Sequence, residues 1–115
     1  MSDQHILNRL YEILQARKNA EGEKSYVASL YEKGTEKIAE KIREEAEELI
    51  VEAQLLDKDA ADAAVQKNIR SEAADLLFHM MVMLSHHDVP AEDVFEILEG
   101  RFGVSGHEEK ASRGQ

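Results

Sequence analysis

The sequence contains no cysteine and no tryptophan, and Pro90 is its only proline. Without cysteine the chain forms neither a disulfide nor a thiolate metal site, and a cytoplasmic location fits this composition. No apolar run reaches the roughly 18 residues that a membrane-spanning helix needs. The first residues, Met1 to His5, show no basic segment followed by an apolar one, so we expect neither a signal peptide nor a membrane anchor.

A net positive charge is also lacking. Acidic residues number 24 and basic residues 14, which gives a formal net charge of −10. Sequence-independent binding of nucleic acid requires a basic surface that neutralises phosphates, so the composition argues against it. A phosphorylated small molecule remains a compatible substrate, provided that divalent cations lie between the protein carboxylates and the phosphates.

Helical periodicity, in contrast, runs through most of the chain. Apolar residues recur every three or four positions in five stretches, and none alternates with the period of a strand. The stretches cover residues 6–14, 25–34, 35–56, 65–84 and 90–102. Ser25 and Thr35 are predicted helix caps, and Gly34 is a predicted helix stop. We therefore predict an all-α antiparallel bundle of four to five helices over residues 1–103, followed by a polar tail over residues 104–115.

Carboxylates border the apolar stripe of the first long helix. At about 100° per residue, Glu45 lies on the buried side between Ile42 and Leu49. Glu48 falls on the same flank, whereas Glu44 points towards solvent. Glu45 and Glu48 are three residues apart, so both lie on one helix face about one turn from each other.

The second long helix repeats this arrangement with Glu72 and Asp75. Glu72 lies between Ile69 and Leu76, where partial desolvation of a carboxylate is costly without a compensating charge. No lysine or arginine lies close enough in sequence on this flank to supply it. Two such helices packed antiparallel would bring together four carboxylates, those of Glu45, Glu48, Glu72 and Asp75. A site made only of oxygen suits Mg²⁺, with Mn²⁺ as an alternative, rather than zinc or copper.

Other polar residues near this flank allow both functional and ordinary explanations. Three lysines lie before or along it and are candidates for phosphate contacts: Lys33, Lys37 and Lys41. Lys41 is equally well placed to pair with Glu45, four residues further on. Acidic strings are also common on solvated helix faces, and His79 is better explained as a hydrogen-bonded histidine at the core edge than as a metal ligand.

Three further segments carry a resemblance to a known family. They are Ser25-Tyr26 with Lys33-Gly34, Glu72-Ala-Ala-Asp75-Leu-Leu-Phe-His79, and Ser105-Gly-His-Glu108-Glu109-Lys110-Ala-Ser112-Arg113. These segments resemble phosphoribosyl-ATP pyrophosphatases, within the all-α nucleotide pyrophosphatase (MazG-like) superfamily. Glu44-Glu45-x-x-Glu48 with Glu72-x-x-Asp75 is similar to the signature of the whole superfamily and is less specific. Val27, where the family usually has threonine, and Arg43, where glycine is frequent, are departures outside the four acids.

The resemblance covers residues from about Ile6 to Arg113 and implies a reaction. Phosphoribosyl-ATP and water would give phosphoribosyl-AMP and pyrophosphate, the second step of histidine biosynthesis. Mg²⁺ held by the four acids would assist, with Glu44 or Glu48 as the base that accepts a proton from water. The match also suggests substrate contacts from the C-terminal part of the chain, by Arg101, Lys110 and Arg113. The family is dimeric, so we expect a homodimer that completes the helical bundle, and a functional association with phosphoribosyl-AMP cyclohydrolase is a further expectation.

Three alternatives stand beside this interpretation. The first is a house-cleaning pyrophosphatase that acts on free nucleoside triphosphates. The second is a di-iron helical bundle, but this architecture uses Glu-x-x-His pairs, and none occurs at Glu45 or Glu72. The third is a helical interaction module without catalytic activity, whose acidic faces are only solvated surface.

Overall fold

The computed structural model describes residues 5–18 and 25–103, and within these ranges the chain is helical without any strand. It contains five helices: α1 (Ile6–Lys18), α2 (Tyr26–Lys33), α3 (Thr35–Lys58), α4 (Ala63–His86) and α5 (Ala91–Phe102). The prediction of an all-α fold is confirmed. None of the helices in the described part is long and apolar enough to cross a membrane.

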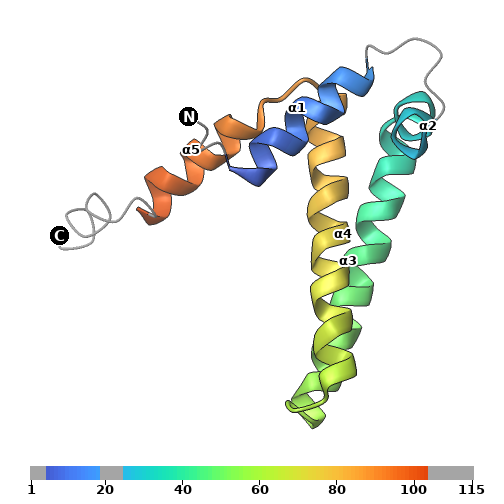
Figure 1. Cartoon of the computed structure of the whole chain (residues 1–115), viewed down its shortest axis with the longest axis vertical. Coiled ribbons are helices and arrows are strands. Elements are labelled where there is room, and N and C mark those ends of the chain that lie inside the picture. Colours follow the sequence, from blue (N-terminus) through green and yellow to red (C-terminus); the bar gives the residue numbers. More distant parts are fainter. Residues whose placement is uncertain (1–4, 19–24, 104–115) are drawn as a thin grey trace.

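The long helices α3 and α4 form an antiparallel pair joined by a short turn at residues 59–62 (Figure 1). Helices α1 and α2 pack at the end of this pair remote from the turn, and α5 contacts both α1 and α4. The predicted helical bundle therefore forms only at the end of the α3–α4 pair that is remote from the turn. Towards the turn, α3 and α4 extend as two helices beyond the others (Figure 1).

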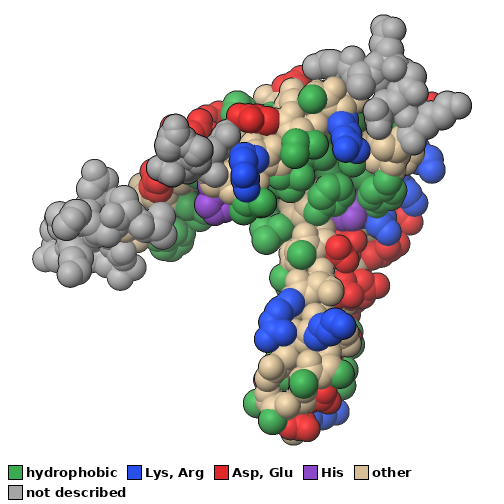
Figure 2. Space-filling view, in the orientation of Figure 1, with side chains coloured by type: hydrophobic (Ala, Val, Ile, Leu, Met, Phe, Trp, Pro, Cys, Tyr) green, Lys and Arg blue, Asp and Glu red, His purple; other side chains and the backbone are tan. Residues whose placement is uncertain are grey.

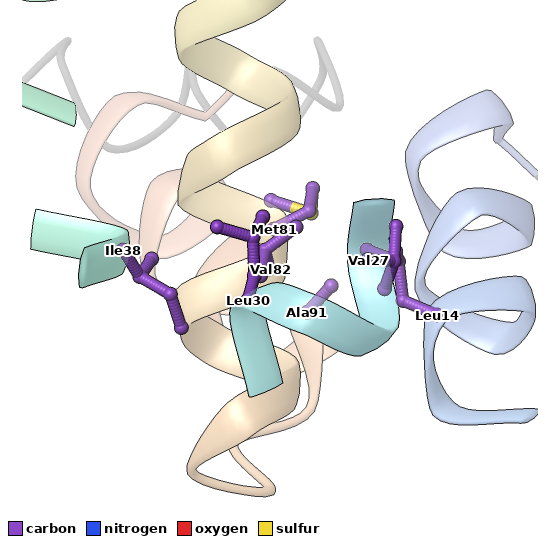
Figure 3. Close-up of a cluster of buried hydrophobic side chains, with 7 residues drawn as sticks. All are labelled: Leu14, Val27, Leu30, Ile38, Met81, Val82 and Ala91. Atoms are coloured by element: carbon purple, nitrogen blue, oxygen red, sulfur yellow. The ribbon is translucent and has the colours of Figure 1, made fainter. Parts of the chain in front are cut away.

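One hydrophobic core connects all five helices at the bundled end. Its fully buried members are Leu14, Val27, Leu30, Ile38, Met81, Val82 and Ala91 (Figure 3). Each helix contributes at least one of them. Removing these side chains from water stabilises the fold by roughly 1.5–3 kcal/mol for each large aliphatic residue, and this end of the molecule therefore holds α3 and α4 in fixed register.

The helix boundaries agree with most of the predicted signals. The Ser25 hydroxyl caps α2 by accepting a hydrogen bond from the backbone nitrogen of Ala28. Gly34 ends α2 with a φ of +87°, a conformation that favours glycine. The prediction that Thr35 caps α3 is wrong, because Thr35 is already the first helical residue, and its hydroxyl lies 3.0 Å from Nε2 of His87.

Polar side chains from α1 fix the C-terminal end of α4, which finishes at His86 as predicted. The ammonium group of Lys18 donates to the carbonyl oxygen of Ser85 at 2.8 Å and to Oδ1 of Asp88 at 2.7 Å. The side-chain amide of Gln15 donates to the same carbonyl at 2.9 Å. These donors satisfy helix-end carbonyls that have no partner within the helix.

Several apolar residues at helical spacing are exposed. Ile6 is 61% exposed and Ile13 51% exposed, and the buried side of α1 is formed by Leu14 with Leu7 and Leu10. Leu77 and Met80 on α4 are also exposed. Periodicity identifies an apolar stripe, but it does not tell whether the same chain covers that stripe.

The molecule is extended. The radius of gyration is 17.2 Å, above the roughly 13 Å of a compact domain of 100 residues.

Candidate active site

Two pairs of carboxylates lie on α3 and α4, which pack against each other. Glu45 and Glu48 lie one turn apart on α3, and Glu72 and Asp75 lie one turn apart on α4. Glu45 is buried, Glu72 is half-buried, and Glu48 and Asp75 are exposed. The group therefore extends from the edge of the core to the surface. Figure 2 shows acidic side chains gathered along one edge of the α3–α4 pair, with a histidine and basic side chains at one end of the group.

Glu72 is at the electrostatic centre of this group. A hydrogen bond with Glu48 raises the pKa of Glu72, and loss of solvent and the negative charges of Glu48, Asp75 and Glu45 raise it further. The charges of the three other acids thus all act on Glu72. Among the described residues, Oε1 of Glu72 is the one enclosed side-chain oxygen or nitrogen without a hydrogen-bond partner. An enclosed carboxylate oxygen without a partner is unfavourable unless a positive group meets it.

Glu45 has a different environment, because a buried histidine binds it. Nδ1 of His79 lies 2.6 Å from Oε1 of Glu45, and Nε2 of His79 lies 2.7 Å from the hydroxyl of Tyr26. Tyr26 is the first residue of α2, so this chain of contacts links α2, α4 and α3. Both ring nitrogens are engaged, which agrees with the expectation of a hydrogen-bonded histidine at the core edge.

The donor atoms of the four acids fit a hard divalent cation, since all are carboxylate oxygens. The enclosed oxygen of Glu72 is the observation that favours such an ion. In the present side-chain conformations, no three histidine, aspartate or glutamate residues of the described chain are arranged to hold one. Glu48 and Asp75 are exposed, so their side chains have room to change rotamer.

The lysines before the acidic flank form ion pairs along α3. The ammonium group of Lys37 lies 3.3 Å from Glu40, and that of Lys41 lies 3.3 Å from Glu44. Lys41 therefore pairs with Glu44 and not with Glu45, the partner considered from the sequence. The pKa of Lys41 is raised mainly by the hydrogen bond with Glu44, and also by the nearby Tyr26.

A family model described as phosphoribosyl-ATP pyrophosphohydrolase matches residues 7–102, which include all five helices almost completely. The chain belongs to the phosphoribosyl-ATP pyrophosphohydrolase family. The resemblance identified in the sequence is thereby confirmed.

Relatives of this family align along nearly the whole chain. A phosphoribosyl-ATP pyrophosphatase from Hydrogenovibrio crunogenus is 49% identical over 94% of this chain and 92% of its own length. Proteins of the same name from Geobacter sulfurreducens and Trichlorobacter lovleyi are 46% and 42% identical, over 96% and 97% of this chain. They are covered over 94% and 96% of their own lengths. This member of the family is therefore similar to them in length as well as in sequence.

The remaining substrate-contact candidates of this family member lie elsewhere. Lys33 is exposed in the last turn of α2. Arg101 is exposed in the last turn of α5, at the end of α5 that points away from the α3–α4 pair (Figure 1). Within one chain, Arg101 is thus not brought to the carboxylates. Lys110 and Arg113 lie outside the described residues.

Sequence reasoning missed the contact between Tyr26 and His79. Both residues belong to segments that carry the family resemblance, but the two are 53 positions apart. Helical periodicity relates positions within one helix and gives no register between α2 and α4. The only signal was the placement of His79 one turn after Asp75, on the flank that carries the acids.

Proposed function

We propose that the protein hydrolyses phosphoribosyl-ATP to phosphoribosyl-AMP and pyrophosphate, the second step of histidine biosynthesis. The bond between the α and β phosphates breaks, and the water supplies one oxygen and two hydrogens to the products. The observation that carries the proposal is the group of four carboxylates around the enclosed oxygen of Glu72. The activity named for the relatives supports the choice of substrate.

On this proposal Glu45, Glu48, Glu72 and Asp75 would hold Mg²⁺, or Mn²⁺ in its place. Such a cation would supply positive charge against the phosphate oxygens and lower the pKa of water at the site. The protein contributes the placement of the ligands. Glu45 is fixed by His79, whereas Glu48 and Asp75 are exposed and can adjust to the substrate.

Of the two candidates for the base, the contacts favour Glu48 over Glu44. Of the neighbouring acids, Glu48 has the largest effect on the pKa of Glu72, whereas Glu44 is paired with Lys41. A general base must lie within hydrogen-bond reach of the water whose proton it accepts. Glu48 meets this requirement for water bound beside Glu72. Glu44 would have to leave its lysine first.

Basic side chains would bind the phosphates and the ribose-phosphate arm of the substrate. Lys41 is the best supported of them, because its charge acts on the hydroxyl of Tyr26 beside the buried Glu45. The other proposed contacts are Lys33, Lys37, Arg101, Lys110 and Arg113. The ion pairs of Lys37 and Lys41 with surface glutamates are weak in water and would exchange for phosphate at little cost.

A homodimer is part of the same proposal. Helices α3 and α4 expose apolar side chains that one chain does not cover: Ile50, Val51, Leu55, Leu77 and Met80. A second copy would bury them and complete the bundle, and it would offer a second α5 with its Arg101.

The test of the homodimer is the mass in solution, measured by light scattering during gel filtration. We expect twice the 13.0 kDa of one chain, and dissociation when Leu77 and Met80 are both changed to glutamate. Ile13→Glu, also at an exposed position, is the control.

The proposal places the reaction in the cytoplasm, where ATP derivatives are made. It also includes a functional association with phosphoribosyl-AMP cyclohydrolase, which would consume the product. Neither point is needed for the chemistry at the four carboxylates.

The experiment that tests the function is incubation with phosphoribosyl-ATP and Mg²⁺, with the released pyrophosphate measured. We expect hydrolysis that stops on chelation of the metal. The same assay with ATP, dUTP and modified triphosphates separates this substrate from those of a house-cleaning enzyme. We expect kcat/KM for phosphoribosyl-ATP to exceed theirs by about 100-fold or more, as for a site that binds the substrate's own polar groups. A preference for free triphosphates would overturn the proposed substrate.

A further inference from the structure

His79 connects two side chains whose roles would otherwise be unrelated. It is only 5% exposed, and its partner Glu45 is 7% exposed. Its ring nitrogens lie 2.6 Å from Oε1 of Glu45 and 2.7 Å from the hydroxyl of Tyr26. The ring also meets Tyr26 and Phe78 edge-on, so aromatic neighbours restrict its rotation.

The direction of these hydrogen bonds follows from the partners of the ring. Nδ1 faces two acceptors, the carboxylate of Glu45 and the carbonyl oxygen of Asp75 at 3.0 Å. It must therefore carry a hydrogen and donate it. In a neutral ring Nε2 is then an acceptor, so the hydroxyl of Tyr26 donates to it. The chain runs from Tyr26 through His79 to Glu45, and each member determines the orientation of the next.

The side chain of Glu45 is thereby held by a hydrogen bond from His79. His79 engages Oε1, and no described residue hydrogen-bonds to Oε2. Glu48 and Asp75, in contrast, are exposed. A buried carboxylate with one oxygen held and the other available is the arrangement expected of a metal ligand that the protein orients in advance.

We propose that His79 and Tyr26 are positioning residues, which hold the carboxylate of Glu45 in a single orientation so that its Oε2 is ready to bind a divalent cation. The inference rests on the proposed metal-dependent function. The inference adds that the carboxylate of Glu45 is already oriented before a cation binds. It also gives α2 a role in the site, because Tyr26 is the first residue of that helix.

Three variants separate positioning from plain structural support. His79→Leu removes both hydrogen bonds and keeps an apolar side chain in the core. His79→Asn places an amide nitrogen at the position of Nδ1, so it can still donate to Glu45 but cannot reach Tyr26. Tyr26→Phe removes only the hydroxyl and keeps the ring against Phe78.

The measurement is the Kd for Mn²⁺ without substrate, from the electron paramagnetic resonance signal of free Mn²⁺, on protein whose helicity is checked by circular dichroism. We expect His79→Leu to bind Mn²⁺ about 10–100-fold more weakly, the usual effect of removing a group that orients a metal ligand. His79→Asn should recover most of the affinity, and Tyr26→Phe should lie between wild type and His79→Leu.

The outcomes are distinguishable. If folded wild type binds no Mn²⁺, the proposed metal site fails and this inference fails with it. If wild type binds Mn²⁺ and the folded His79 variants bind it equally well, only the positioning role is overturned, and the contacts are structural. If His79→Leu does not fold, Tyr26→Phe decides in the same way, since an affinity equal to that of wild type contradicts the inference.

Discussion

Glu48 on α3 is the neighbour that acts most strongly on Glu72 of α4, and the two acids together raise the pKa of Glu72 across the helix pair. Without a cation, the neighbouring acids and the loss of solvent raise the pKa of Glu72 and make its ionised form unfavourable. The unfavourable ionisation of Glu72 lowers the stability of the fold, and it would also favour the binding of a cation. A positively charged ligand beside Glu72 would reverse this effect on the ionised form.

Glu72→Gln is expected to separate stability from activity. The pKa of Glu72 is higher in the folded protein than in the unfolded chain, so ionisation above that pKa disfavours folding. Glutamine removes this effect. In the presence of a chelator we therefore expect a higher Tm for the variant at pH 7, and a difference that closes as the pH falls below the unfolded pKa of about 4.3. Differential scanning calorimetry measures it.

The same variant should lose pyrophosphate release by about 100-fold or more, because the charge stabilisation that a bound divalent ion supplies is worth several kcal/mol. Mg²⁺ should raise the Tm of wild type and leave that of the variant unchanged. Glu47→Gln is the matched control, since Glu47 lies on α3 in an exposed position. Equal loss of activity in both variants would contradict a specific role of Glu72.

Lys41 and Lys37 form a second matched comparison. Each makes the same ion pair with a glutamate three residues on, at 3.3 Å, but only Lys41 acts on Tyr26 beside the site. Changing either to methionine should cost at most about 1 kcal/mol of stability, since exposed ion pairs contribute little. For Lys41→Met we expect a KM for phosphoribosyl-ATP that is about tenfold higher. The reason is that the variant loses one charged hydrogen bond to the substrate, which is worth about 1.5–3 kcal/mol. Lys37→Met should raise KM less. Steady-state kinetics that show the reverse order would exclude Lys41 as the principal phosphate contact.

The end of α4 predicts a pH-dependent contribution to stability. Hydrogen bonds from Lys18 and Gln15, and then the charge of Lys18, lower the pKa of Asp88. A carboxyl group with a lowered folded pKa stabilises the protein above its unfolded pKa of about 3.9, and the contribution disappears as the pH falls through the folded value. Asp88→Asn should therefore unfold at lower urea concentration than wild type at pH 7. At pH 3 the two midpoints should lie closer together. A constant difference at both pH values would argue against the ion pair.

The shared core predicts where the fold is most sensitive. Ile38 has no exposed surface and packs among residues from the other helices. Ile38→Ala should lower the free energy of unfolding by about 2–5 kcal/mol, through lost burial and the cavity that remains. Ile13→Ala on α1, where the side chain is half exposed, should cost clearly less. Urea denaturation followed by circular dichroism provides both values, and similar losses would contradict a core in which Ile38 contributes more than Ile13.

The acids of the site could be found from the sequence because a helix repeats a simple angle. Glu45 was expected on the buried side of its helix and is buried; Glu72 was expected to be partly desolvated and has an enclosed oxygen. Antiparallel packing of the two long helices was expected, and α3 and α4 pack in this way (Figure 1). These inferences needed only information within a helix and its immediate neighbour.

Two features could not be predicted from the sequence. One is how helices far apart in the sequence align with each other, and the other is whether a second chain covers an exposed apolar side chain. The contact of Tyr26 with His79 depends on how α2 lies against α4, which the spacing of residues within either helix does not determine. Met80 carries an apolar side chain at a helical core spacing and is nevertheless exposed. Its burial depends on a partner surface, and periodicity cannot report that.

The most direct test of the account is a crystal structure of the protein grown with Mn²⁺ and recorded at a wavelength where manganese scatters anomalously. The account predicts an anomalous peak about 2.0–2.3 Å from carboxylate oxygens of Glu45, Glu48, Glu72 and Asp75, the distances of divalent ions bound by oxygen. His79 should remain hydrogen-bonded to Glu45. An anomalous peak at other residues, or a structure saturated with Mn²⁺ in which these carboxylates contact only water, would contradict the central claim.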